Sequence, residues 1–215
     1  MLAGRASLLA LVSLLLAIPL VPPAQASHEY QQGTIRNWET TSLDVLVLAP
    51  HDPVVGGAIV EAMDAWEVGI DELSPALGAA LSWRVHWPSR DLAPAPADFE
   101  ADIVIVPQGG WAVNVHWEQS VANIPDCYVF APLFLMPFEL YFTVAHEFGH
   151  CLGLGHVFDH GREYFPEFDV MGQGRLPDGG KACPSNLNVQ VLEMVYSGQT
   201  GTVTMPASEY FQSSC

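Results

Sequence analysis

The sequence predicts an α+β domain whose first half is of α/β type. Two observations support this fold class. Strand-length runs of β-branched apolar residues are separated by a long stretch with the period of an amphipathic helix, and a second segment, rich in histidine and glycine, follows at residues 143–156. We expect one domain with a sizeable core over residues 42–215, preceded by a short, polar and irregular segment at residues 27–41.

The first strand and the first helix are predicted near the start of this domain. Leu43–Ala49 is an apolar run of strand length, typical of a strand buried on both faces. Asp52 and Pro53 follow as a helix cap and a first-turn proline. The apolar positions of the helix then recur every three or four residues, which predicts that it packs on the sheet: Val55, Ile59, Ala62, Met63, Trp66, Ile70 and Leu73.

Four further strands are predicted before the histidine-rich segment. Leu81–Trp87 alternates in polarity, and Asp102–Pro107 is a buried apolar run that follows a proline-rich loop. Gly109–Trp117 alternates again, as expected of a strand with one solvated face. A loop and a short apolar strand come next, within residues 123–137.

The histidine-rich helix is predicted to start near Pro137 or Phe138. Its sequence places Phe138, Phe142 and Ala145 at three- and four-residue steps. We therefore expect these three side chains on its buried side.

The string HEFGHCLGLGH has the spacing of a metal site. His146 and His150 are one helical turn apart, so both imidazoles leave the same face of the helix. Gly153 can adopt the positive φ that ends a helix, and the chain then returns with His156 toward the same point. Three imidazoles leave the fourth position of a zinc ion open, as hydrolytic zinc sites require. Glu147 lies beside them and can accept a proton from water without being a ligand.

This HExxHxxGxxH string resembles the signature of the metzincin metallopeptidases, and it is most similar to the matrixin version. Met171, in the sequence DVMGQG, matches the methionine that metzincins place in a turn beneath the zinc. The segment Cys183–Gly198 is similar to the helix that closes matrixin catalytic domains. The resemblance implies a zincin-like fold: a twisted mixed sheet, a long active-site helix, a C-terminal helix, and an active-site cleft between an upper and a lower subdomain.

The resemblance also implies a zinc endopeptidase. His146, His150 and His156 are then the ligands of one catalytic Zn²⁺, and Glu147 activates a zinc-bound water for attack on a peptide bond. Two alternatives remain open. The chain could be a metal-binding scaffold of the same fold without catalysis, or a zinc hydrolase of a non-peptide bond.

Substrate contacts are implied at two places. The metzincin strand that corresponds to Gly109–Trp117 pairs with an extended peptide, which suggests Asn114, Val115 and His116 as substrate-binding residues, although an ordinary edge strand fits equally well. The segment after the methionine turn walls a substrate pocket in metzincins. Arg175 or Lys181 is therefore a candidate to select an acidic side chain in a protein or peptide substrate.

Residues 1–26 have the pattern of a signal peptide. Arg5 precedes an apolar run that is too short to be a stable membrane span, and small residues end the segment at Ala26. We expect cleavage before Ser27 and a secreted monomer without a membrane anchor.

The charge balance makes nucleic acid a poor partner. The formal net charge is −17, with 24 acidic residues against 7 basic ones. Asp159, His160 and Glu163 are candidate ligands for a second cation such as Ca²⁺, but acidic loop residues are more often only solvated.

The cysteines form an even set, which in a secreted chain favours two disulfides. Three pairings of Cys127, Cys151, Cys183 and Cys215 are open. We favour Cys151 with Cys183, which would tie the active-site helix to the last helix, and Cys127 with Cys215, which would hold the C-terminal tail. We do not expect Cys151 to be a fourth ligand, because adjacent residues on a helix diverge by about 100°.

Overall fold

A computed structural model of the chain describes residues 27–30, 38, 40–48, 52–87, 101–108, 115–119, 125–159, 169–172, 183–199, 201, 203–206 and 209–215. The predicted signal peptide, three of the suggested substrate-binding residues (Asn114, Arg175 and Lys181) and two of the suggested second-cation ligands (His160 and Glu163) lie outside these ranges.

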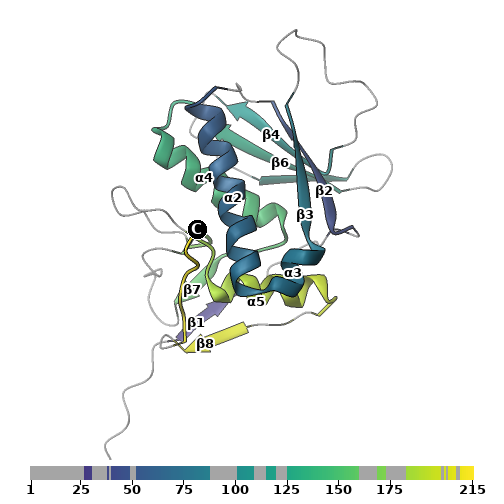
Figure 1. Cartoon of the computed structure of the whole chain (residues 1–215), viewed down its shortest axis with the longest axis vertical. Helices are drawn as coiled ribbons and strands as arrows, with labels where there is room; N and C mark the ends of the chain where they lie inside the picture. The colour runs from purple at the N-terminus through teal and green to yellow at the C-terminus, as the bar shows by residue number, and fades with distance from the viewer. Residues whose placement is uncertain are drawn as a thin grey trace, which may run out of the picture.

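The larger of the two sheets has five strands in the order β3-β2-β4-β6-β5 (Figure 1). Four of them are parallel, because β2 pairs in parallel with β3 and β4, and β4 pairs in parallel with β6. β5 is antiparallel to β6 and forms one edge. The bounds are β2 (Ser42–Val47), β3 (Ser82–His86), β4 (Ile103–Gln108), β5 (Val115–Gln119) and β6 (Pro125–Pro132). The predicted mixed α+β fold class is confirmed.

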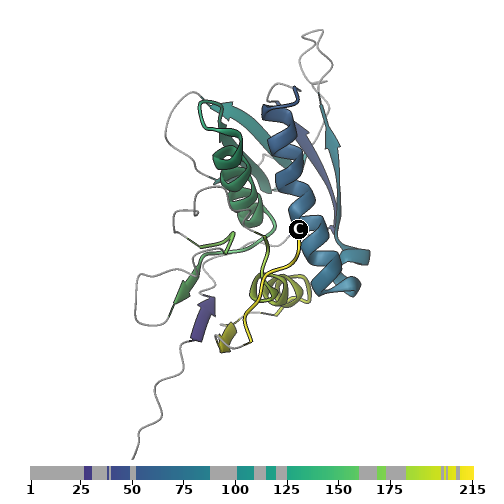
Figure 2. The same cartoon turned by 60° about the vertical axis from the view of Figure 1, so that its left-hand side comes forward.

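Two helices lie side by side along one face of this sheet, as both views show (Figures 1 and 2). They are α2 (Val55–Leu73), which is followed by the short α3 (Pro75–Ala80), and α4 (Pro137–Cys151). Alternate strand residues such as Val45 and Ile105 point into the core, where they join Trp66 of α2 and Phe148 of α4. None of the helices within the described ranges is long and apolar enough to cross a membrane.

The buried side of α4 differs from the predicted one. Phe138 is 42% exposed and Phe142 is only half-buried, whereas Ala145 is fully buried as expected. The buried positions follow another pair of four-residue rows: Leu140, Tyr141, Val144, Ala145 and Phe148. The prediction failed because it centred the buried face on the row of Phe138 and Phe142, whereas α4 presents the neighbouring rows, which include Phe148, to α2 and β6.

A second, smaller sheet lies at the other end of the molecule (Figure 1). It has three antiparallel strands in the order β7-β1-β8: β1 (Ser27–Tyr30), β7 (Val157–Asp159) and β8 (Val203–Pro206). The prediction that residues 27–41 are irregular is therefore wrong at its start, because these backbone groups are paired. The C-terminal helix expected from the resemblance is α5 (Asn186–Tyr196), which packs against α2 and β8.

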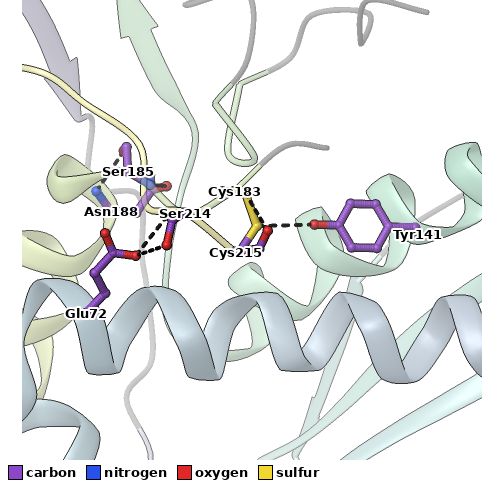
Figure 3. The surroundings of a disulfide bond; sticks show 7 residues. All are labelled: Glu72, Tyr141, Cys183, Ser185, Asn188, Ser214 and Cys215. Atoms are coloured by element: carbon purple, nitrogen blue, oxygen red, sulfur yellow. Dashed lines mark hydrogen bonds between the residues drawn. A yellow bond between two sulfur atoms is a disulfide. The ribbon is translucent and has the colours of Figure 1, made fainter. Parts of the chain in front are cut away.

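The prediction of two disulfides is confirmed, but the predicted partners are wrong. The bonds join Cys127 to Cys151 and Cys183 to Cys215. α4 follows β6 in the chain and packs back along it, which brings Cys151 to a Cα distance of 5.8 Å from Cys127. The C-terminal tail likewise runs back to the start of α5, where Cys215 meets Cys183 (Figure 3).

Candidate metal centre

The C-terminal end of α4 has the geometry that the glycine spacing predicts. The backbone N–H of Gly153 donates to His150 O, and the N–H of Leu154 donates to Gly149 O, both at 3.0 Å. These two bonds form a Schellman motif, which satisfies carbonyls at the end of a helix and needs a left-handed residue. Gly153 supplies it with a φ of 109°. The chain therefore turns sharply within three residues of the helix end.

This turn brings the third histidine to the other two. The Nε2 atom of His156 lies 3.2 Å from Nε2 of His146 and 3.2 Å from Nε2 of His150. The possible ligand atoms of the three residues all lie within 4.8 Å of one another. Two nitrogens bound to one tetrahedral zinc at about 2.0–2.1 Å are separated by roughly 3.3 Å. The spacing of these three histidines therefore fits a single divalent ion.

Hydrogen bonds fix which ring nitrogen of His146 and of His150 carries the proton. Nδ1 of His146 lies 2.7 Å from Val170 O, and Nδ1 of His150 lies 2.7 Å from Leu154 O. A backbone carbonyl only accepts, so the proton of each ring is on Nδ1 and Nε2 carries a lone pair. Such partners orient the ring of a metal-ligating histidine. Both lone pairs thus face the centre of the cluster.

The histidines are also neutral at physiological pH. Burial is the largest cause of a fall in the pKa of His146 to about 3 and of His156 to about 4, and the neighbouring His150 lowers both further. Burial lowers the pKa of His150 as well. Neutral imidazole is the form that binds a metal. The cluster can therefore take up a cation without first losing protons.

Glu147 is the acidic group nearest to the cluster along α4. Its side chain is half-buried, and burial raises the pKa of its carboxyl group to about 7. A carboxyl group with a pKa near the working pH is suited to both accepting and returning a proton. This property supports the role that the sequence predicts for Glu147.

Gly149 lies between the two helical histidines and was missed as a site residue. A Cβ atom placed there would lie 2.6 Å from Trp66 Cζ2 and closer still to Met171 Sδ. Both neighbours are completely buried. Glycine inside a helix costs stability, so its presence in this string is a sequence signal for close packing that could have been recognised.

Met171 lies in a turn that connects two parts of the cluster. The turn is closed by a bond of 2.9 Å from Gly172 N–H to Asp169 O. Val170 O accepts from His146, and Met171 O accepts from the N–H of Val157, the residue after His156, at 3.0 Å. The turn is therefore bonded both to α4, through His146, and to the segment that carries His156. The Met171 side chain lies against Gly149.

Two tryptophans hold α4 in place, and neither was predicted to act on the site. Trp66 Nε1 donates to Ala145 O at 2.8 Å, and Trp38 Nε1 donates to Cys151 O at 2.8 Å. Both rings are buried. An indole N–H only donates, so each bond fixes its ring against one turn of α4, at Ala145 for Trp66 and at Cys151 for Trp38. These bonds come from distant segments and leave no local pattern in the sequence.

Three of the remaining predicted residues lie on strands. Val115 and His116 lie on β5, which is an edge strand among the described strands, with Val115 opposite Val129 and His116 opposite Tyr128 of β6. Asp159, one of the suggested second-cation ligands, pairs with His28 of β1. The roles suggested for these residues stay predictions.

Among known proteins, a likeness to this chain is found in structure and not in sequence. No model of a known protein family matches the chain, and no curated protein matches its sequence. Among solved structures, the crystal structure of myroilysin is similar over 80% of this chain and 68% of its own, with 17% sequence identity and a TM-score of 0.34. Because this likeness is low, the function proposed below depends on the geometry of the histidines.

Proposed function

We propose that this protein is a secreted zinc-dependent endopeptidase with the metzincin fold. The observation that carries the proposal is the convergence of His146, His150 and His156: Nε2 of His156 lies from each of the other two at about the separation of ligands on a tetrahedral ion, and all three lie within 4.8 Å of one another. All three ligands are imidazoles, a set that suits Zn²⁺ and leaves one coordination position open. The two disulfides are consistent with an extracellular protein.

The residues of the chain have separate roles in this proposal. When bound, zinc supplies a Lewis acid that polarises the scissile carbonyl and lowers the pKa of a coordinated water. Glu147 takes the proton that the attacking water loses and delivers it to the leaving amine. The carbonyls of Val170 and Leu154 keep His146 and His150 in the orientation that directs Nε2 inward.

The proposed substrate is a protein or peptide in extended conformation. β5 is an edge strand in the described sheet, and an edge offers unpaired backbone groups to which an extended peptide can add as a further strand. Asn114, Val115, His116 and Arg175 are kept as candidate contacts of this substrate. We propose a monomer that acts without nucleic acid and without a membrane anchor.

The test is hydrolysis of an unfolded protein by the purified mature chain, with and without a chelator. We expect fragments without the chelator, none with it, and recovery when one equivalent of Zn²⁺ is restored. Zinc uptake without any cleavage would favour the metal-binding scaffold, and cleavage of model esters but not of peptides would favour a hydrolase of another bond.

Replacement of the proposed base separates catalysis from metal binding. Glu147→Ala should abolish peptide hydrolysis while zinc uptake stays stoichiometric, because Glu147 is not a ligand. The matched control is Glu67→Ala, the same substitution on the exposed face of α2, which should retain wild-type activity. Full activity of Glu147→Ala would remove Glu147 from its proposed role.

A further inference from the structure

A buried carboxylate lies immediately beside the turn that contacts the metal centre. Asp169 is only 3% exposed, and it accepts three hydrogen bonds. Its Oδ1 accepts from Met171 N–H at 2.7 Å, and its Oδ2 accepts from Ser185 Oγ at 2.7 Å and from Tyr210 OH at 2.8 Å. Burial of a carboxyl group is costly unless it is satisfied in this way. The proposed reaction gives Asp169 no role, so its retention in the core needs an explanation.

The donors to Asp169 come from separate parts of the chain. Ser185 is the N-cap of α5, where its side chain also accepts from Asn188 N–H at 3.2 Å. Tyr210 belongs to the C-terminal tail. Burial, and next the charge of Asp169, raise the pKa of Tyr210, so its hydroxyl stays protonated and remains a donor. The start of a helix also favours a negative charge nearby. Asp169 therefore joins the turn to α5 and to the tail.

The same turn is bonded to both arms of the histidine cluster. Val170, the next residue, accepts the Nδ1 proton of His146 at 2.7 Å. Met171, whose N–H is held by Asp169, accepts from Val157 N–H beside His156 at 3.0 Å. One backbone step thus separates the carboxylate from the carbonyl that orients the first histidine. A shift of the turn would rotate that imidazole.

We propose that Asp169 is a positioning residue of the metal centre: its carboxylate fixes the turn at residues 169–172, and thereby the Val170 carbonyl that directs His146 Nε2 at the ion. This inference rests on the metal site proposed above. Partners that orient a ligand in this way typically change metal affinity by about 10–100-fold when they are lost.

Asp169→Asn is the most direct variant. It keeps the volume and shape of the side chain, but an amide has one oxygen, which can satisfy either the Met171 N–H or the two hydroxyl donors and not all three. The probe is Co²⁺ alone, titrated into metal-free protein below the unfolding temperature of every variant. The readouts are the dissociation constant and the visible absorption spectrum of the bound Co²⁺. A role confined to global stability would change neither readout.

Glu72→Gln is the matched control. Glu72 of α2 accepts from both the backbone N–H and the hydroxyl of Ser214 at 2.8 Å (Figure 3). It therefore holds the same C-terminal tail through Ser214, whereas Asp169 holds it through Tyr210. We expect Asp169→Asn to raise the Co²⁺ dissociation constant by about 10–100-fold and to alter the spectrum. Glu72→Gln should leave both as in the wild type.

The outcomes separate this inference from the proposed function. If the wild type binds one Co²⁺ and hydrolyses peptides while Asp169→Asn binds it equally well, the inference alone is overturned. An equal loss of affinity in Glu72→Gln also overturns it, because the tail and not the carboxylate would then be responsible. A wild type that binds no metal overturns both. If Asp169→Asn does not fold, Tyr210→Phe decides: weaker Co²⁺ binding than in Glu72→Gln supports the inference, and equal binding overturns it.

Discussion

Gly149→Ala tests how tightly the metal centre is packed. The added methyl group would lie 2.6 Å from Cζ2 of Trp66, which is far inside the ordinary contact distance, and closer still to Sδ of Met171. The methionine side chain is flexible, but it is completely buried. The indole is rigid, and its Nε1 is bonded to Ala145 O at 2.8 Å. The substitution therefore has to move α4 away from α2 or displace the turn that carries Met171.

The magnitude follows from two opposed effects. Replacing glycine by alanine inside a helix stabilises it by about 1 kcal/mol. Overpacking of a well-packed core costs about 1–3 kcal/mol. With two fully buried neighbours, the cost should be near the upper limit, which leaves a net loss of about 2 kcal/mol in the free energy of unfolding. Because Gly149 lies between His146 and His150, zinc affinity should also fall.

The assay is urea unfolding of the metal-free protein with its disulfides intact, followed by zinc titration against a chelator. Gly57→Ala is the matched control, since Gly57 is also helical and a Cβ atom there would have no neighbour within 4 Å. It should leave zinc affinity unchanged and stabilise the chain by up to about 1 kcal/mol. If Gly149→Ala is as stable as Gly57→Ala and binds zinc like the wild type, the reasoning about close packing is refuted.

Two further predictions concern stability. The hydrogen bond from His86, and next the charge of Arg84, hold the pKa of Asp44 below its ordinary value of 3.8. The contribution of Asp44 to the free energy of unfolding is therefore present above pH 3.8, and it is lost as the pH falls through the lowered pKa. Asp44→Asn should therefore cost less than about 1 kcal/mol near neutral pH and nothing at the acid end, as urea unfolding at both pH values would show; an equal cost at both would contradict this. Replacing both Cys183 and Cys215 by alanine removes a disulfide that joins positions 32 residues apart, and it should lower the free energy of unfolding by about 3–4 kcal/mol. An unchanged unfolding midpoint would contradict that estimate.

Much of the fold could be predicted because its long elements have clear periods. The apolar runs of β2 and β4 and the seven apolar positions of α2 were recognisable from the sequence alone. The strands β1, β7 and β8 were not, since runs of three or four residues are too short to show a period. They form only because segments far apart in the chain meet.

The candidate site also has a part that could be predicted from the sequence and a part that could not. Gly153 and the three histidines are close in sequence, so helix geometry was enough to predict that they converge. The contacts of Trp38, Asp169 and the cysteines join residues that are distant along the chain. The sequence offers no measure of such distances, which is why the disulfide partners were predicted wrongly and Asp169 was overlooked.

X-ray absorption spectroscopy at the zinc edge, on purified protein loaded with one equivalent of Zn²⁺, tests most directly whether His146, His150 and His156 hold one ion. We expect three imidazole nitrogens at about 2.0–2.1 Å together with one oxygen ligand, and loss of one imidazole in His156→Ala. A spectrum with sulfur ligands, a spectrum with fewer than three imidazoles, or protein that never takes up stoichiometric zinc would contradict it.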